Sequence, residues 1–148
     1  FRGVRVITSD VPPSNAFTEP ETQDLVVTFR NLHNWLGRDS MQAVMLEAYN
    51  ALKPGGYFGV VEHRAPEGSS LEYMKKSGYV TQSLAIEKAL EVGFVLVGTS
   101  EINANPNDTA DHPKGVWTLP PSYRLKDKDR AKYESIGESD RMTLLFKK

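Results

Sequence analysis

The stretch ALKPGGYFGVVEH, residues 51–63, holds the end of a helix and the start of a strand within a few positions. Pro54 cannot continue a helix, and the glycine pair after it can adopt a left-handed turn, so a helix ends here. The residues after this turn are rich in aromatic and β-branched side chains, which favours a strand over residues 57–63. The sequence therefore predicts a helix that reverses directly into a strand.

The residues before this turn extend the unit toward the N-terminus. Apolar side chains recur there at spacings of three and four, which predicts a helix over residues 41–52 with one apolar stripe. Further upstream, DLVVTF, residues 24–29, is an apolar run without alternation, typical of a strand buried on both faces of a parallel sheet. This strand, helix and strand with short connections predict a right-handed crossover between parallel strands.

The rest of the chain predicts further elements of a single α/β domain. These are a short strand at residues 4–8, a helix at about 79–92, and strands at 94–102 and 142–146. Residues 103–140 are polar and rich in Asn, Asp and Pro, with a short helix favoured near residues 127–133. So long a connection in a compact domain is typical of a functional loop, and we expect a lid here.

Composition restricts the classes of partner. The chain has 148 residues, a formal net charge of −1 and no stripe of Lys or Arg, so we expect no nucleic acid partner. The absence of cysteine excludes disulfides and thiolate metal sites and leaves the compartment open, with the cytoplasm as the default. No apolar run is long enough to cross a bilayer. Because the first residue is Phe1 and not Met, we expect a processed product or a fragment.

The order of these segments resembles that of a known enzyme family. The segments are Asp24-Leu-Val-Val, ALKPGG at residues 51–56, Val60-Val-Glu62 and Val92-Gly-Phe94. Together they resemble the second half of a class I S-adenosylmethionine-dependent methyltransferase. The chain is also similar to the C-terminal part of a group of bacterial predicted methyltransferases that carry FRNLHNW, here residues 29–35.

This resemblance implies a Rossmann-like sheet with helices on both faces, strand order 3-2-1-4-5-7-6 and an antiparallel last strand. The five predicted strands would be strands 3 to 7 of that sheet. The glycine-rich cofactor loop after strand 1 has no counterpart, because no two glycines stand at G-x-G spacing. We therefore expect a C-terminal portion of a larger domain, in which residues 4–8 pair elsewhere, swing out or pair with a second chain in a homodimer.

The resemblance also implies an activity, namely methyl transfer from S-adenosylmethionine to a small-molecule acceptor. The alternative is a non-catalytic half-domain of the same fold that self-associates or binds a partner. A nicotinamide dinucleotide domain is a third interpretation, which the ALKPGG turn and the order of the last strands disfavour.

A histidine and a carboxylate are the predicted catalytic pair. Leu32-His33-Asn34-Trp35 is similar to the LHDW segment of small-molecule O-methyltransferases, in which the histidine removes the proton of the acceptor. Glu62, at the end of the strand at residues 57–63, occupies the place of the carboxylate that orients that histidine. Asn34 stands where that family has Asp. A histidine that only packs beside Trp35 is the competing interpretation of His33.

Four residues are predicted to bind the cofactor. Asp10 resembles the acidic residue that accepts a hydrogen bond from the adenine amino group, with the backbone amide of Val11 at the ring. Phe29 and Arg30 resemble positions beside the methionine part of the cofactor. The competing interpretations are a turn-forming Asp before proline and an aromatic side chain in the core.

A metal site is the last alternative. His33, Glu62 and His63 could meet at the strand ends, but no H-x-H or H-E-x-x-H spacing is present, so we predict no metal. His63 is expected to be a surface residue at the strand end. Within residues 103–140, Trp117, Tyr123 and Tyr133 either close over a substrate or anchor an irregular flap.

Overall fold

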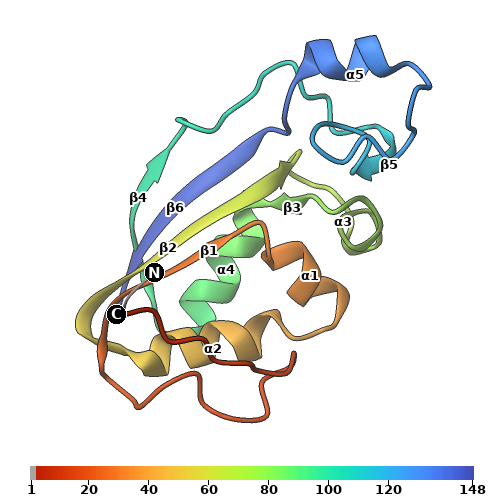
Figure 1. Cartoon of the computed structure of the whole chain (residues 1–148). Coiled ribbons are helices and arrows are strands. Elements are labelled where there is room, and N and C mark those ends of the chain that lie inside the picture. Colours follow the sequence, from red (N-terminus) through yellow and green to blue (C-terminus); the bar gives the residue numbers. More distant parts are fainter. Residues whose placement is uncertain (1–2) are drawn as a thin grey trace.

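The computed structural model describes residues 3–148 and shows a mixed α/β architecture (Figure 1). Eleven elements follow one another along these residues. They are β1 (Gln23–Phe29), α1 (Leu32–Gly37), α2 (Met41–Ala51), β2 (Leu52–Ala65), α3 (Leu71–Ser77), β3 (Val80–Thr81), α4 (Gln82–Val92), β4 (Val95–Ser100), β5 (Pro113–Val116), α5 (Arg130–Ile136) and β6 (Arg141–Lys147). None of the helices in this part of the chain combines the length and apolar character of a membrane span.

Four strands form the main sheet in the order β1-β2-β6-β4, and β3 adds a short pairing to β2. β1 and β2 are parallel, whereas β6 is antiparallel to both of its neighbours. In terms of the implied strand numbers this order is 4-5-7-6, with strand 7 antiparallel. The α/β class, the order of the four strands and the antiparallel last strand are therefore confirmed.

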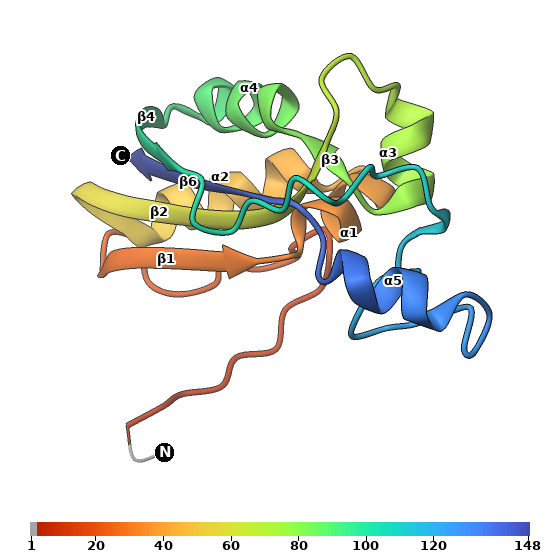
Figure 2. The ribbon, with the colours of Figure 1, turned by 90° about the horizontal axis from the view of Figure 1, so that it is seen from above.

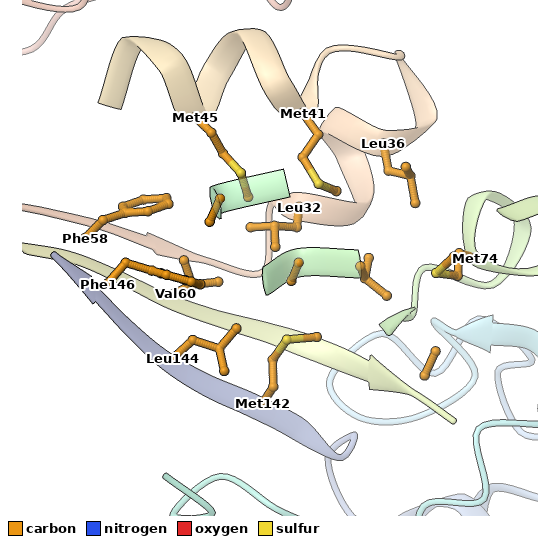
Figure 3. Packing of buried hydrophobic residues seen from close by; sticks show 14 of the residues in the cluster. Leu32, Leu36, Met41, Met45, Phe58, Val60, Met74, Met142, Leu144 and Phe146 are labelled. Carbon is orange, nitrogen blue, oxygen red and sulfur yellow. The ribbon is translucent and has the colours of Figure 1, made fainter. Parts of the chain in front are cut away.

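One face of the sheet packs against helices and forms the core. Phe58 and Val60 of β2 and Leu144 of β6 point toward Met41 and Met45 of α2 (Figure 3). Phe94, which follows α4, stacks on Phe58 with ring centroids 5.1 Å apart, so α4 covers the same face. The predicted stripe of residues 41–52 thus faces the sheet, with Met41, Val44, Met45, Ala48 and Ala51 buried.

The opposite face of the sheet is open, which corrects two predictions. The second helical layer expected on that face does not occur within residues 3–148, where apolar residues of that face such as Val27 and Leu145 stay exposed. β1 is consequently not buried on both faces. Leu25, Val27 and Phe29 remain 57%, 50% and 59% exposed, while Thr28 on the helical side is buried. An apolar run without alternation indicates that both faces of a strand are apolar. It does not indicate whether another layer covers each face.

Residues 4–8 form no strand, contrary to the prediction. Val4 and Val6 are 66% and 87% exposed, and this part of the chain joins no strand of the sheet (Figure 2). A β-branched composition favours a strand only where the segment pairs with a neighbour, and residues 4–8 pair with no strand of the described chain. Edge strand β1 pairs with β2 alone among the described residues.

Other elements also differ from the sequence prediction, and β2 begins at Leu52 and not at residue 57. The polar turn after β1 contains a helix, α1, because Leu32 and Leu36 stand four residues apart and both reach the core. α4 begins at Gln82 and not near residue 79, since the Thr81 side chain caps it by accepting a hydrogen bond from the Leu84 amide at 3.3 Å. The predicted short helix near residues 127–133 is present as α5.

Candidate active site

The candidate site lies at the carboxyl ends of the parallel strands β1 and β2, where ligands bind in open α/β sheets. β1 ends at Phe29, and Arg30 turns the chain with a left-handed φ of 58° while its amide donates to the Val61 carbonyl at 2.7 Å. Leu32 then anchors α1 in the core. This sequence of a strand end, a turn and a short helix holds His33 over the end of β2.

His33 and Glu62 form a hydrogen-bonded pair. Nδ1 of His33 lies 2.9 Å from Oε1 of Glu62, and the His33 amide donates to Oε2 at 3.1 Å. The His63 amide also donates to Oε1 at 2.8 Å, and the Glu62 side chain is fully buried. An ionised carboxylate only accepts hydrogen bonds, so Nδ1 carries the proton in this pair. Nε2, the outer ring nitrogen, then has a free lone pair.

A cavity of about 270 Å³ adjoins His33. Its walls come from the ends of β1 and β2, from the start of β6 and from the segment of residues 103–140, which lies beyond the strand ends with β5 and α5 (Figure 1). The residues that border it include Arg30, His33, His63, Trp117, Ser139 and Arg141. The cavity is therefore closed in part by the segment that the sequence predicted to be a lid.

His63 belongs to this site and is not the surface residue that the sequence predicted. Its Nδ1 lies 2.5 Å from the Ser139 hydroxyl, and its ring centroid is 5.4 Å from that of His33. Burial lowers the pKa of His63 to about 3, with further lowering by His33, Arg30 and Arg141. His63 is therefore neutral near neutral pH.

Tight packing of β5 on α3 positions the Trp117 wall. Gly115 has a φ of +58°, and a Cβ there would collide with the backbone of Ser77, so no other residue fits this approach. Trp117 stands two residues later and meets the His33 ring edge to face, with centroids 5.9 Å apart. Arg124 covers the Trp117 ring at 4.6 Å. Of the three aromatic residues considered for this role, Trp117 borders the cavity. Tyr133 instead packs on His112.

The four predicted cofactor residues do not line one cavity. Phe29 and Arg30 border the cavity beside His33, whereas Asp10 and Val11 border a separate one of about 610 Å³ with residues of β1, α1 and α2. Asp10 accepts a hydrogen bond from the Ser14 hydroxyl at 2.7 Å. The described residues thus fit S-adenosylmethionine only in part, and the roles of all four remain predictions.

Three residues lie close enough to consider a metal ion. His33, Glu62 and His63 each offer a ligand atom within 4.8 Å of the others, and no further such group occurs in residues 3–148. Both Glu62 oxygens, however, already accept hydrogen bonds, and Nδ1 of His63 bonds Ser139. The carboxylate is engaged in holding His33, so we propose no metal here.

The structure brings together the two residues that were expected to act together, His33 and Glu62, while their catalytic roles remain predictions. Sequence reasoning missed Ser139 and Arg141, which lie far along the chain and reach the cavity because β6 pairs with β2. The register places Arg141 directly opposite His63. The predicted strand order already placed the last strand beside the strand that carries His63. Strand order does not give the register, however, so it could not show that Arg141 lies opposite His63.

Comparison with solved structures identifies the fold. The [4+2]-cyclase SpnF matches with a TM-score of 0.60 at 13% identity, over 94% of this chain and 53% of that chain. An S-adenosylmethionine-dependent methyltransferase from Mesorhizobium loti matches with 0.54 at 14% identity, over 95% and 68%. A phosphoethanolamine N-methyltransferase from Haemonchus contortus, in complex with phosphomonomethylethanolamine and S-adenosylhomocysteine, matches with 0.52 at 16% identity, over 93% and 35%.

The chain therefore has the class I methyltransferase fold, and it spans only part of the proteins that it matches. No family model and no curated protein matches the sequence. At these identities the likeness concerns the fold alone, and one of the matched proteins is a cyclase. The function of this chain therefore depends on the residues of its own site.

Proposed function

We propose that the natural-length protein transfers a methyl group from S-adenosylmethionine to a small-molecule acceptor, with His33 as the general base. One observation carries this proposal, the 2.9 Å hydrogen bond between His33 Nδ1 and the buried Glu62 at the strand ends. The class I methyltransferase fold supports it, because in such sheets this edge faces the ligand crevice. When bound, S-adenosylmethionine supplies an electrophilic methyl group.

The residues of this chain act on the acceptor. Glu62 holds the proton on Nδ1 of His33, which leaves Nε2 to take the proton of an acceptor hydroxyl. Three N–H groups fix the Glu62 carboxylate, so the ring is positioned before the acceptor enters. Trp117 provides an apolar wall that holds an organic acceptor against the base. Phe29, at the same cavity, is the proposed contact on the cofactor side.

Two measurements on the natural-length protein test this proposal. Calorimetric titration with S-adenosylmethionine should show saturable binding, and methyl groups should pass from labelled S-adenosylmethionine to small hydroxylated acids or phenols. His33→Asn should lower turnover by about 100-fold or more and leave cofactor affinity nearly unchanged, because a general base contributes about 10² to 10⁴. Added imidazole should restore part of the rate. Absence of cofactor binding would overturn the proposed methyltransferase function. An unchanged rate in His33→Asn would show that His33 has a packing role only.

The open face of the sheet favours a second candidate, a non-catalytic half-domain that self-associates. Leu25, Val27, Phe29 and Leu145 are exposed on this face, and the last three of them border an apolar hollow of about 420 Å³. Contiguous apolar surfaces of this kind mark interaction sites, and β1 adds an unpaired edge. A sedimentation coefficient that rises with protein concentration, and that Val27→Lys returns to the monomer value, would support this candidate. A monomer at all concentrations would exclude it.

A further inference from the structure

Two arginines from distant parts of the sequence border the cavity beside His33. Arg30 follows the last residue of β1, and Arg141 is the first residue of β6. β2 pairs with both strands, so its end, which carries Glu62 and His63, lies between the two arginines. The sheet therefore brings two positive charges to the place where the proposed acceptor meets its base.

Each arginine has a feature that packing alone leaves unexplained. Nε of Arg141 is buried and has no hydrogen-bond partner among the described residues, and an unsatisfied buried donor is costly. Arg30 lies at the turn after β1 and borders the same cavity. Its side chain is exposed and forms no ion pair within residues 3–148.

The acidic groups nearby do not neutralise both arginines. Glu138 pairs with Nη1 of Arg141 at 2.7 Å, and its side chain is 50% exposed. Glu62 is held by N–H groups of His33 and His63. His63, uncharged near neutral pH, adds no positive charge. Arg30, and the part of the Arg141 guanidinium that Glu138 does not engage, thus remain as donors for a ligand.

We propose that the acceptor carries an oxyanion group, a carboxylate or a phosphate, which Arg30 and Arg141 bind while Trp117 contacts its organic part. Planar guanidinium groups donate two parallel hydrogen bonds to such oxyanions, which gives orientation as well as affinity. Anchoring the acceptor in this way fixes the position of its hydroxyl relative to His33. The proposal rests on the proposed function, because that function makes the bound molecule a methyl acceptor.

Histidine ring signals in nuclear magnetic resonance spectra of the natural-length protein provide the test. Benzoate, phenyl phosphate and the neutral benzamide are titrated separately at constant ionic strength without cofactor. The signals of His33 and His63 should shift saturably with one or both anions and much less with benzamide. His112, which does not border this cavity, serves as the internal control. Which anion binds more tightly distinguishes a carboxylate from a phosphate ligand.

Charge-neutral variants identify the anchoring residues. Arg141→Gln and Arg30→Gln should each weaken anion binding by about tenfold, the loss expected for one charge-assisted hydrogen bond. Arg38→Gln removes the same charge from an exposed residue that does not border the cavity, and it should change nothing. Equal binding of benzamide, absence of anion binding, or anion binding unchanged in both variants would overturn the proposal.

The same experiment separates the two proposals. Binding of an anion at His33 and His63 without any methyl transfer would overturn the proposed function and leave this oxyanion site in place. Methyl transfer by a protein whose His33 signal responds equally to benzamide and benzoate would support the proposed function and overturn the oxyanion site. An unshifted His112 signal in Arg141→Gln would show that the segment around this cavity has kept its structure.

Discussion

Residues 3–148 contain two buried histidine–carboxylate pairs, and we propose a catalytic role for the pair formed by His33 and Glu62. His33 lies 2.9 Å from Glu62, and His112 lies 2.8 Å from Asp108. Both carboxylate side chains are fully buried, and the two histidine side chains are 9% and 4% exposed. A distance and a burial value therefore do not distinguish the two pairs.

The nitrogen that forms the bond does distinguish them. His33 uses Nδ1, the inner nitrogen, which leaves the outer Nε2 for an acceptor. His112 uses Nε2 itself. Asp108 also accepts hydrogen bonds from the Tyr79 hydroxyl and from the amides of Ala110 and Asp140, and so ties residues 103–140 to the rest of the domain. A histidine bonded to a buried carboxylate thus holds the proposed base in one region and fastens a loop in the other.

Replacement of Asp108 should give the largest loss of stability. Asp108→Ala leaves the Tyr79 hydroxyl, His112 and two amides without an acceptor, so we expect a loss of about 3–5 kcal/mol in the free energy of unfolding. Urea unfolding followed by circular dichroism measures this loss. A midpoint close to that of the unchanged protein would mean that the Asp108 network does not fasten the loop. The His112–Asp108 pair would then have no structural role to set it apart from the His33–Glu62 pair.

Glu62→Gln should separate function from stability at the other pair. Glutamine keeps one accepting oxygen but cannot accept from all three N–H groups, so we expect a loss of about 1–3 kcal/mol in stability. Turnover should fall by about 100-fold, since His33 loses the partner that fixes its tautomer. Glu62→Asp, which keeps the charge, should recover part of the rate. If Glu62→Gln lost stability without losing turnover, Glu62 would have a purely structural role, as proposed for Asp108.

The contrast also shows how far the sequence could be interpreted. Local patterns were sufficient for β1, α2, β2, β4 and β6, because turn residues and apolar periodicity act within a few positions. They failed at residues 4–8 and on the open face of β1, where the outcome depends on which surface covers an apolar side chain. α1 was missed because one turn of helix, anchored by Leu32 and Leu36, is too short for a periodicity to stand out.

The candidate site was predictable where a motif carries it. His33 follows the end of β1 and Glu62 lies near the end of β2, and the parallel pairing of these strands brings them together as expected. His63, Ser139 and Arg141 reach the same cavity through the register of β6 on β2, which leaves no mark in the sequence. The hydrogen bond between His112 and Asp108 could likewise not be predicted from the sequence, because Asp and Pro in that segment are also typical of an ordinary turn.

The pH dependence of stability should report His63, which lies between the base and the arginines. Its pKa is about 3 in the folded protein against 6.5 when unfolded, so between these values the unfolded state binds more protons. Stability should therefore fall as the pH falls, by about 2 kcal/mol from pH 7 to pH 5 for this group. His63→Gln should flatten this part of the profile in urea unfolding at several pH values. An unchanged slope would mean that His63 is more solvated than its contacts with Ser139 and His33 indicate.

The smallest effect is expected at Arg64, which connects the regions of the two pairs. Its Nε and Nη2 donate to Asp140 at 2.8 and 3.0 Å, while Nη1 and Nη2 donate to Glu101. Asp140 stands between Ser139 and Arg141 of the cavity wall, and its amide donates to Asp108. Arg64→Lys keeps the charge but loses the planar fork, so we expect a loss of about 0.5–1 kcal/mol in stability, as for a partly exposed pair. If Asp140 transmits the position of the loop to the cavity, the Michaelis constant for the acceptor should rise while cofactor affinity stays constant. A change in stability alone would show that the two regions are fastened independently.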